Sequence, residues 1–102
     1  MVGALSDLGR WRLAPRVGAA VTMLLRHHPD VRITSGRRSV EHNRIVGGAP
    51  RSRHLLGAAV DLAGPEATLR HLRAVARRYG ATEVLNEGDH THLGWPRSWG
   101  TS

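Results

Sequence analysis

The stretch RSRHLLGAAVDLAG, residues 51–64, places two potential metal ligands around a small apolar spacer. His54 and Asp61 stand seven residues apart, and mainly Gly, Ala and Leu lie between them. In a helix this spacing would separate the two side chains by about 10 Å along the axis, and Gly57 also disfavours a helix. We therefore expect a turn at residues 55–57 followed by a strand, which returns Asp61 to the side of His54.

A turn followed by a strand would also explain why the residues between His54 and Asp61 are small. Gly57, Ala58 and Ala59 would let the backbone pack closely at the site, where larger side chains would block it. Alternate residues of a strand point to opposite faces, so Asp61 can face the site while Val60 faces the core.

A second group of candidate ligands lies in GDHTHLGW, residues 88–95. His90 and His92 would share one face of a strand, because residues i and i+2 do so. The chain has seven His and no Cys, so a tightly bound transition metal must use His and carboxylate. Together with His54 and Asp61 this makes four candidates. Spacing alone does not decide which three bind, since three histidines are as suitable as two histidines and one carboxylate.

Two carboxylates, Glu87 and Asp89, come just before this histidine pair. Metal-assisted hydrolysis needs a base that takes a proton from the attacking water. The same residues are also typical of a turn, because Asn, Gly and Asp favour turn conformations. Both interpretations of Asp89 stay open at this point.

The chain of 102 residues is short enough for one domain, residues 1–102. It has three Trp, one Tyr and no Phe, so its core must be aliphatic. All the basic residues are Arg, and the formal charge of +7 suits an anionic partner such as a cell wall, a nucleic acid or a membrane surface. We expect no specific nucleic-acid partner, because a nucleic-acid-binding domain would leave the His and Asp residues unexplained and few aromatic side chains could stack on bases.

The first fifteen residues contain Asp7 and no apolar run. They resemble neither a signal peptide nor a membrane span. We therefore expect synthesis in the cytoplasm and another route for any export.

The pattern of apolar residues predicts alternating helices and strands. Val17, Ala20, Val21, Leu24 and Leu25 form one apolar stripe of a helix, with His27 and His28 near its C-terminal end. The outer face of the second long helix, which carries His71, is expected to be solvated. The expected elements are a helix from residue 15 to Pro29, a strand at 31–35, a short helix near 40–45, a strand at 59–63, a helix with Pro65 as its first residue and Gly80 as its end, and strands at 82–86 and 90–95. This order predicts an α+β domain with a small antiparallel sheet flanked by helices.

Three segments, ITSGRRS, SRHLLGAAVD and DHTHL, resemble the zinc D-Ala-D-Ala peptidase family. That family shares a fold with the Hedgehog signalling domain and includes phage endolysins and bacterial carboxypeptidases. The family pattern S-x-H-x-x-G-x-A-x-D matches at every fixed position: Ser52, His54, Gly57, Ala59 and Asp61. The motif-bearing part is about residues 31–96, and the implied fold is that of the Hedgehog and D,D-peptidase domains.

The resemblance implies one zinc ion held by His54, Asp61 and His92, with water in the open position. It implies that Asp89 acts as the base, with His90 positioning it or stabilising the oxyanion. Glu87 is the reserve candidate for the base.

The S-G-x-R turn of the family places Arg38 where it could stabilise an oxyanion or bind a substrate carboxylate. Ser52 is implied to support the ligands or to contact substrate. Many relatives carry Tyr where this chain has Arg37, and this difference would alter substrate contacts.

The predicted function is that of a zinc metallopeptidase that hydrolyses D-Ala-containing stem or cross-link peptides of peptidoglycan. Family habits favour a phage lysin or a virion-associated peptidase, monomeric, that reaches the wall through a holin or as part of the particle. The alternative is a catalytically inactive, zinc-containing cell-wall-binding or structural domain of the same fold. The scissile bond stays open, as does the choice of base among Asp89, His90 and Glu87.

Overall fold

A computed structural model describes residues 8–101 of the chain. The prediction made for the segment around Asp7 therefore lies outside the described residues. Among the described residues, no helix is both long and apolar enough to cross a membrane. The α-helices are α2 (Pro15–His27), α3 (Val40–Ile45) and α4 (Glu66–Val75); the strands are β1 (Arg32–Ser35), β2 (Ala59–Ala63), β3 (Glu83–Asn86) and β4 (Thr91–Gly94); short 3₁₀ helices are η1 (Leu8–Trp11), η2 (Arg53–Leu56), η3 (Ala76–Tyr79) and η4 (Arg97–Trp99).

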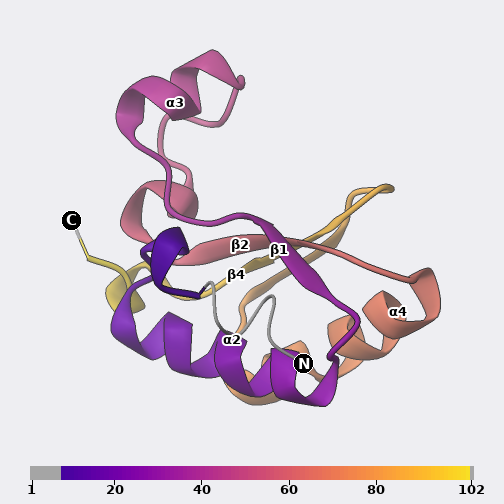
Figure 1. Cartoon of the computed structure of the whole chain (residues 1–102). Helices are drawn as coiled ribbons and strands as arrows, with labels where there is room; N and C mark the ends of the chain where they lie inside the picture. Colours follow the sequence, from indigo (N-terminus) through magenta and orange to yellow (C-terminus); the bar gives the residue numbers. More distant parts are fainter. Residues whose placement is uncertain (1–7, 102) are drawn as a thin grey trace.

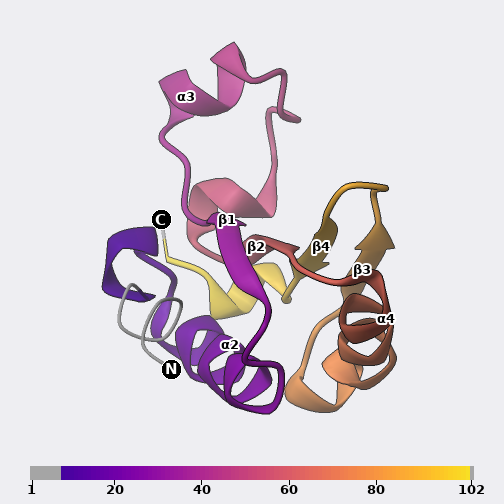
Figure 2. The same ribbon diagram turned by 45° about the vertical axis from the view of Figure 1, so that its right-hand side comes forward.

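The four strands form one antiparallel sheet in the order β1-β2-β4-β3. Helices α2 and α4 lie on one side of the sheet, whereas α3 stands away from it on the other side (Figures 1 and 2). The predicted α+β class with a small antiparallel sheet and flanking helices is confirmed.

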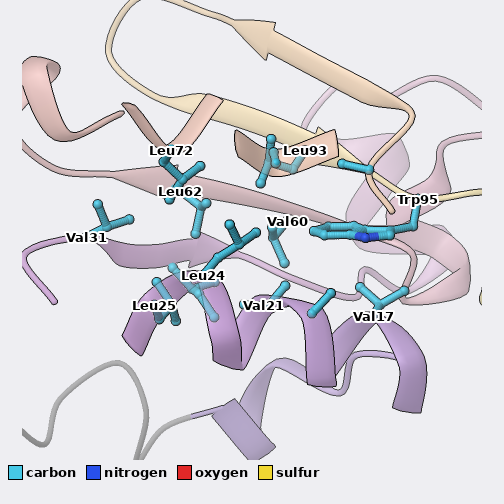
Figure 3. Close-up of a cluster of buried hydrophobic side chains, with 14 of the residues drawn as sticks. Val17, Val21, Leu24, Leu25, Val31, Val60, Leu62, Leu72, Leu93 and Trp95 are labelled. Carbon is cyan, nitrogen blue, oxygen red and sulfur yellow. The ribbon is translucent and has the colours of Figure 1, made fainter. Parts of the chain in front are cut away.

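The core lies between α2 and the sheet, and Figure 3 shows the side chains from both meeting there. Each fully buried aliphatic side chain contributes about 1.5–3 kcal/mol relative to an exposed one. The largest fully buried side chains are Trp95, Leu24, Leu25, Leu62, Leu72, Leu93, Val17, Val21, Val31 and Val60. The predicted apolar stripe of α2 is therefore the surface that holds this helix against β2 and β4.

His28 lies at the C-terminal end of α2, as predicted, but it also makes side-chain contacts that the sequence did not predict. Its ring is buried, with Nδ1 2.7 Å from the Leu24 carbonyl oxygen, which only accepts. Nδ1–H therefore caps the helix. Nε2 of His28 lies 2.8 Å from Nδ1 of His71 on α4. The exposed His71, expected to be only solvated, thus links α4 to the end of α2.

Several predicted boundaries were wrong by one residue: β1 and β3 each begin one residue later than expected, and β4 ends one residue earlier. Helix α4 begins at Glu66, and Pro65 precedes it with an extended backbone conformation. Strand β4 begins at Thr91 because the hairpin loop closes with the hydrogen bond from the Glu87 N–H to the His90 carbonyl, 2.9 Å. His90 therefore belongs to the loop rather than to the strand. Gly80 ends the helical segment with a φ of 94°, as the sequence predicted.

The turn after His54 forms as predicted, but its small residues have a different neighbour. Gly57 has a φ of 67°, a left-handed conformation that favours glycine. A Cβ atom there would lie 2.7 Å from the Arg37 guanidinium and 2.9 Å from the Ala14 nitrogen. The close packing at Gly57 is thus against the segment before α2, not against the metal ligands.

Arg37, which stands where many relatives carry Tyr, makes contacts within the protein. Its guanidinium donates to the carbonyls of Arg12, Leu55 and Thr101 and to the Thr101 hydroxyl. It therefore joins the N-terminal segment, the turn and the C-terminal segment.

Candidate metal centre

Two neighbouring strands and the turn bring three ligand-type side chains together. Asp61 of β2 pairs directly with His92 of β4, and η2 places His54 beside them. Asp61 Oδ1 lies 3.1 Å from His92 Nδ1 and 3.4 Å from His54 Nε2. One ligand atom from each of the three lies within 4.8 Å of the others. This group is one of the combinations that the sequence left open, and it is the one that the family resemblance implied.

His54 is fixed by its outer nitrogen. Nδ1 lies 2.8 Å from the Gly36 carbonyl, and because a carbonyl only accepts, Nδ1 carries a proton. The other ring nitrogen, Nε2, therefore faces Asp61 and is the atom that a metal ion would bind. The Ser52 hydroxyl accepts from the His54 N–H at 3.1 Å, so Ser52 caps the N-terminal end of η2, the short helix that carries this ligand.

His92 is fixed in the same way by a carboxylate. Its Nε2 lies 3.0 Å from Oε1 of Glu83 on the neighbouring strand β3. The other Glu83 oxygen lies 3.5 Å from Nε of Arg53. A Cβ on Gly94 would overlap Glu83 Oε1, so the glycine opposite Glu83 leaves room for this carboxylate.

The donor set fits a metal ion. A histidine that binds a metal commonly donates its second N–H to a carboxylate or carbonyl, as both histidines do here. His54 Nε2, His92 Nδ1 and Asp61 Oδ1 then converge as three acceptors. Two nitrogens and one oxygen from the protein, with a fourth position open, are the ligand set of many catalytic zinc sites.

The pKa shifts of Asp61 and His92 also indicate that positive charge is favoured between the three groups. Burial raises the pKa of the Asp61 carboxyl, but its hydrogen bonds with His54 and His92 outweigh burial and hold that pKa well below its usual range. Burial lowers the pKa of His92, but the carboxylates of Asp61 and Glu83 outweigh it and raise that pKa. A proton fills this need in the metal-free protein, and a bound cation can replace it.

Arg38 contacts the same carboxylate from the opposite side. Its Nη2 lies 3.2 Å from Asp61 Oδ2, and its Nη1 lies 3.3 Å from the Asn43 side-chain oxygen. The backbone N–H of Arg38 donates to the His54 carbonyl at 3.0 Å. Asn43 is buried and donates to the Ala49 carbonyl at 2.8 Å, so the guanidinium has a fixed orientation.

The β3–β4 loop supplies the candidate proton-transfer groups. His90 and Glu87 border a hollow of about 320 Å³ together with the three donors, and His90 Nε2 lies 3.2 Å from Glu87 Oε1. Asp89 lies 2.7 Å from His90 Nδ1, and this contact is the largest cause of the raised pKa of His90. The Asp89 side chain is 92% exposed and borders an adjacent hollow, which Asp61 and His90 also line.

The sequence matches the family model of Peptidase M15 over residues 14–94. The chain belongs to peptidase family M15. A relative in this comparison is the "Zinc D-Ala-D-Ala carboxypeptidase" of Streptomyces albus G, 39% identical over 90 residues. The alignment covers 76% of this chain and 35% of that protein, so the chain spans about a third of the length of the curated relative it matches. The family that the sequence resembled is confirmed, and the zinc in the relative's name agrees with the donor set described above.

In this M15 domain the candidate residues divide into two groups by position. His54, Asp61 and His92 meet at one point, and Arg38 and Ser52 contact them directly. Glu87 and His90 border the same hollow, whereas Asp89 contacts His90 and not the donors. The role of Asp89 as a base remains a prediction.

Two residues of the M15 site had not been identified from the sequence. The hairpin itself is a local signal, but the contact of Glu83 with His92 depends on the strand register, in which residue 85 pairs with His92 and residue 83 shares its face. Asn43 gave only a weak signal: a polar residue on a short helix next to two glycines.

Proposed function

We propose that this M15 domain is a zinc-dependent peptidase that hydrolyses D-Ala-containing stem or cross-link peptides of peptidoglycan. The observation that carries the proposal is the convergence of His54, Asp61 and His92, each with its outer atoms already held by Gly36, Arg38 or Glu83. A site fixed in this way has its ligands oriented before the metal arrives. The name of the Streptomyces relative supports the choice of ion and of substrate class.

The ligand residues would hold one zinc ion, His54 through Nε2, His92 through Nδ1 and Asp61 through Oδ1. When bound, zinc supplies an acidified water and polarises the scissile carbonyl. Asp61 also holds Arg38 at the edge of the site. The positive guanidinium, fixed there by Asp61 and Asn43, can stabilise negative charge that develops on the substrate oxygen.

Proton transfer is assigned to the groups that border the hollow. Glu87 and His90 lie 3.2 Å apart there, so either can accept a proton and share it with the other. Asp89 would orient His90 through Nδ1. This assignment differs from the base implied by the family resemblance, and substitution distinguishes the two.

We also propose that the protein acts at the bacterial cell wall. The formal charge of +7 supports attraction to an anionic wall. We extend the proposal to a monomeric phage lysin or virion-associated peptidase that reaches the wall through a holin or within the particle.

Zinc analysis combined with a cleavage assay tests the function. The purified protein is expected to contain about one zinc per chain and to cleave a peptide ending in D-Ala-D-Ala or the cross-links of purified peptidoglycan. His54→Ala is expected to lose both properties. His27→Ala, which removes an exposed histidine of α2, is the matched control and should keep both. Stoichiometric zinc without cleavage of either substrate would favour the inactive cell-wall-binding domain, and absence of zinc would exclude both.

A further inference from the structure

A second hollow opens beside the metal centre, and arginine side chains dominate its wall. It has a volume of about 490 Å³. Ala49, Ser52 and His92 line both this hollow and the one that contains the donors, so the two hollows are adjacent. Its charged or polar lining residues are Arg51, Arg53, Arg97, Glu83, His92 and Ser52.

The charges around this second hollow do not balance. Three arginines line it beside one carboxylate, that of Glu83, and this carboxylate is already engaged by His92 and Arg53. Arg53 is further fixed by the Thr82 hydroxyl at 2.7 Å and the Trp95 carbonyl at 3.0 Å. The wall therefore keeps an excess of positive charge that an anionic ligand group can neutralise.

Arg51 and Arg97 supply the part of the wall that can bind such a group. Arg97 donates through Nη1 and Nη2 to the Arg51 carbonyl at 2.8 and 2.5 Å, which holds the two segments together. Within residues 8–101, no hydrogen bond or ion pair engages the Arg51 guanidinium. An unengaged guanidinium offers paired N–H donors that match a carboxylate in geometry.

We propose that the arginine hollow is a subsite for a carboxylate of the bound peptide, adjacent to the scissile bond. This inference rests on the proposed peptidase function. His92 is a donor and also lines this hollow, so an extended peptide whose scissile bond lies at the donors can place a neighbouring residue there. The charged groups that such a peptide can bring there as anions are its C-terminal carboxylate and its acidic side chains. Arg51 is the main specificity residue of this subsite.

The test uses two pairs of peptides of otherwise identical sequence. One pair differs in a C-terminal carboxylate or amide, and the other in a Glu or Gln side chain next to the cleaved bond. The wild-type protein is expected to have a KM about tenfold lower for the acid member of one pair, the difference expected for one charge-assisted interaction. The pair that shows this preference identifies the source of the carboxylate. The preference should also weaken as salt is added.

Arg51→Ala should raise KM about tenfold for the preferred acid peptide and leave its amide or Gln counterpart, and kcat, nearly unchanged. Arg51→Lys should restore part of the preference because it keeps the charge. Arg78→Ala removes an equal charge from an exposed position on η3 and is the matched control, expected to change neither peptide. An equal loss for acid and neutral peptides in Arg51→Ala would contradict the subsite, as would a wild-type protein that prefers neither member of either pair.

A direct measurement of peptide binding tests the subsite independently of whether the protein cleaves peptides. The same peptide pairs are labelled with a fluorophore, and their affinity for the zinc-loaded protein is measured by fluorescence anisotropy, which needs no cleavage. Acid-selective binding that Arg51→Ala removes supports the subsite even in a protein that cleaves nothing. Equal affinity for acid and neutral peptides overturns it even in an active peptidase.

Discussion

At the scale of single residues, the metal centre depends on atoms that face away from it. Each ligand uses one atom toward the common point and another toward a fixed partner: Gly36 for His54, Glu83 for His92 and Arg38 for Asp61. Such partners select the tautomer and the ring orientation of a ligand. Metal affinity should therefore respond to residues that never touch the metal.

Glu83 gives the sharpest test of this point. Glu83→Ala removes the acceptor of His92 Nε2–H, so we expect zinc affinity to fall about 10–100-fold. Glu83→Gln keeps an acceptor oxygen and should lose less. Competition with a chromophoric chelator measures the zinc Kd. Glu41→Gln changes an exposed glutamate on α3 and is the control; an unchanged Kd in Glu83→Ala would show that His92 needs no such partner.

The proton-transfer groups can be separated by single substitutions in the β3–β4 loop. We expect Glu87→Gln and His90→Ala to lower kcat about 10²–10⁴-fold, the usual worth of general acid–base catalysis. Asp89→Asn should cost less, because the amide oxygen still accepts from His90 Nδ1–H. Zinc content should stay at the wild-type level in all three proteins. If Asp89→Asn lowers kcat as much as Glu87→Gln does, Asp89 is the base that the family resemblance implied.

At the scale of elements, α3 is a helix with an inverted burial pattern. Its apolar residues Val40 and Ile45 are 75% and 70% exposed, and its buried residue is Asn43. The helix stands off the sheet, on the side opposite α2 (Figures 1 and 2). Since Asn43 holds Arg38, the function of this helix is to orient the guanidinium rather than to build the core.

Asn43→Ala tests the role of α3. The substitution leaves Arg38 Nη1 and the Ala49 carbonyl without their partner, so we expect kcat to fall about tenfold. The zinc Kd should change less than twofold, because no ligand contacts Asn43. Val40→Ala on the exposed face of the same helix should leave kcat unchanged. Equal losses of zinc and of activity in Asn43→Ala would instead indicate general disruption of the site.

Elements with local signals could be predicted from the sequence, whereas contacts across strands could not. The bounds of α3 and β2 were predicted correctly, since glycines, prolines and caps mark both ends. The candidate ligands were found from the spacing of His54 and Asp61 around a turn and of the two histidines at 90 and 92. The pairing of β2 with β4, which places His92 beside Asp61, has no local signal in the sequence. Glu83 was missed because its contact with His92 depends on the β3–β4 register, which also excludes His90 from β4.

At the scale of the whole molecule, β2 separates the core from the metal centre. Val60 and Leu62 are fully buried against the helices, while Asp61 between them faces His54 and His92. A chain of about 100 residues has only a modest core, so a metal that joins β2, β4 and η2 should contribute substantially to its stability.

Removal of the metal measures this link between site and fold. Binding at a free concentration 1,000 times the Kd stabilises a folded protein by about 4 kcal/mol. About 1 kcal/mol shifts the Tm of a domain of this size by about 4–8 °C, so EDTA should lower the Tm by well over 10 °C. His54→Ala should already melt near the metal-free temperature and show no response to EDTA, while His27→Ala should respond as the wild type does. Equal melting of the wild-type protein with and without EDTA would mean that the three ligands hold no ion in the folded chain, and that the direct contacts of Asp61 with His54 and His92 suffice to keep β2, β4 and η2 together.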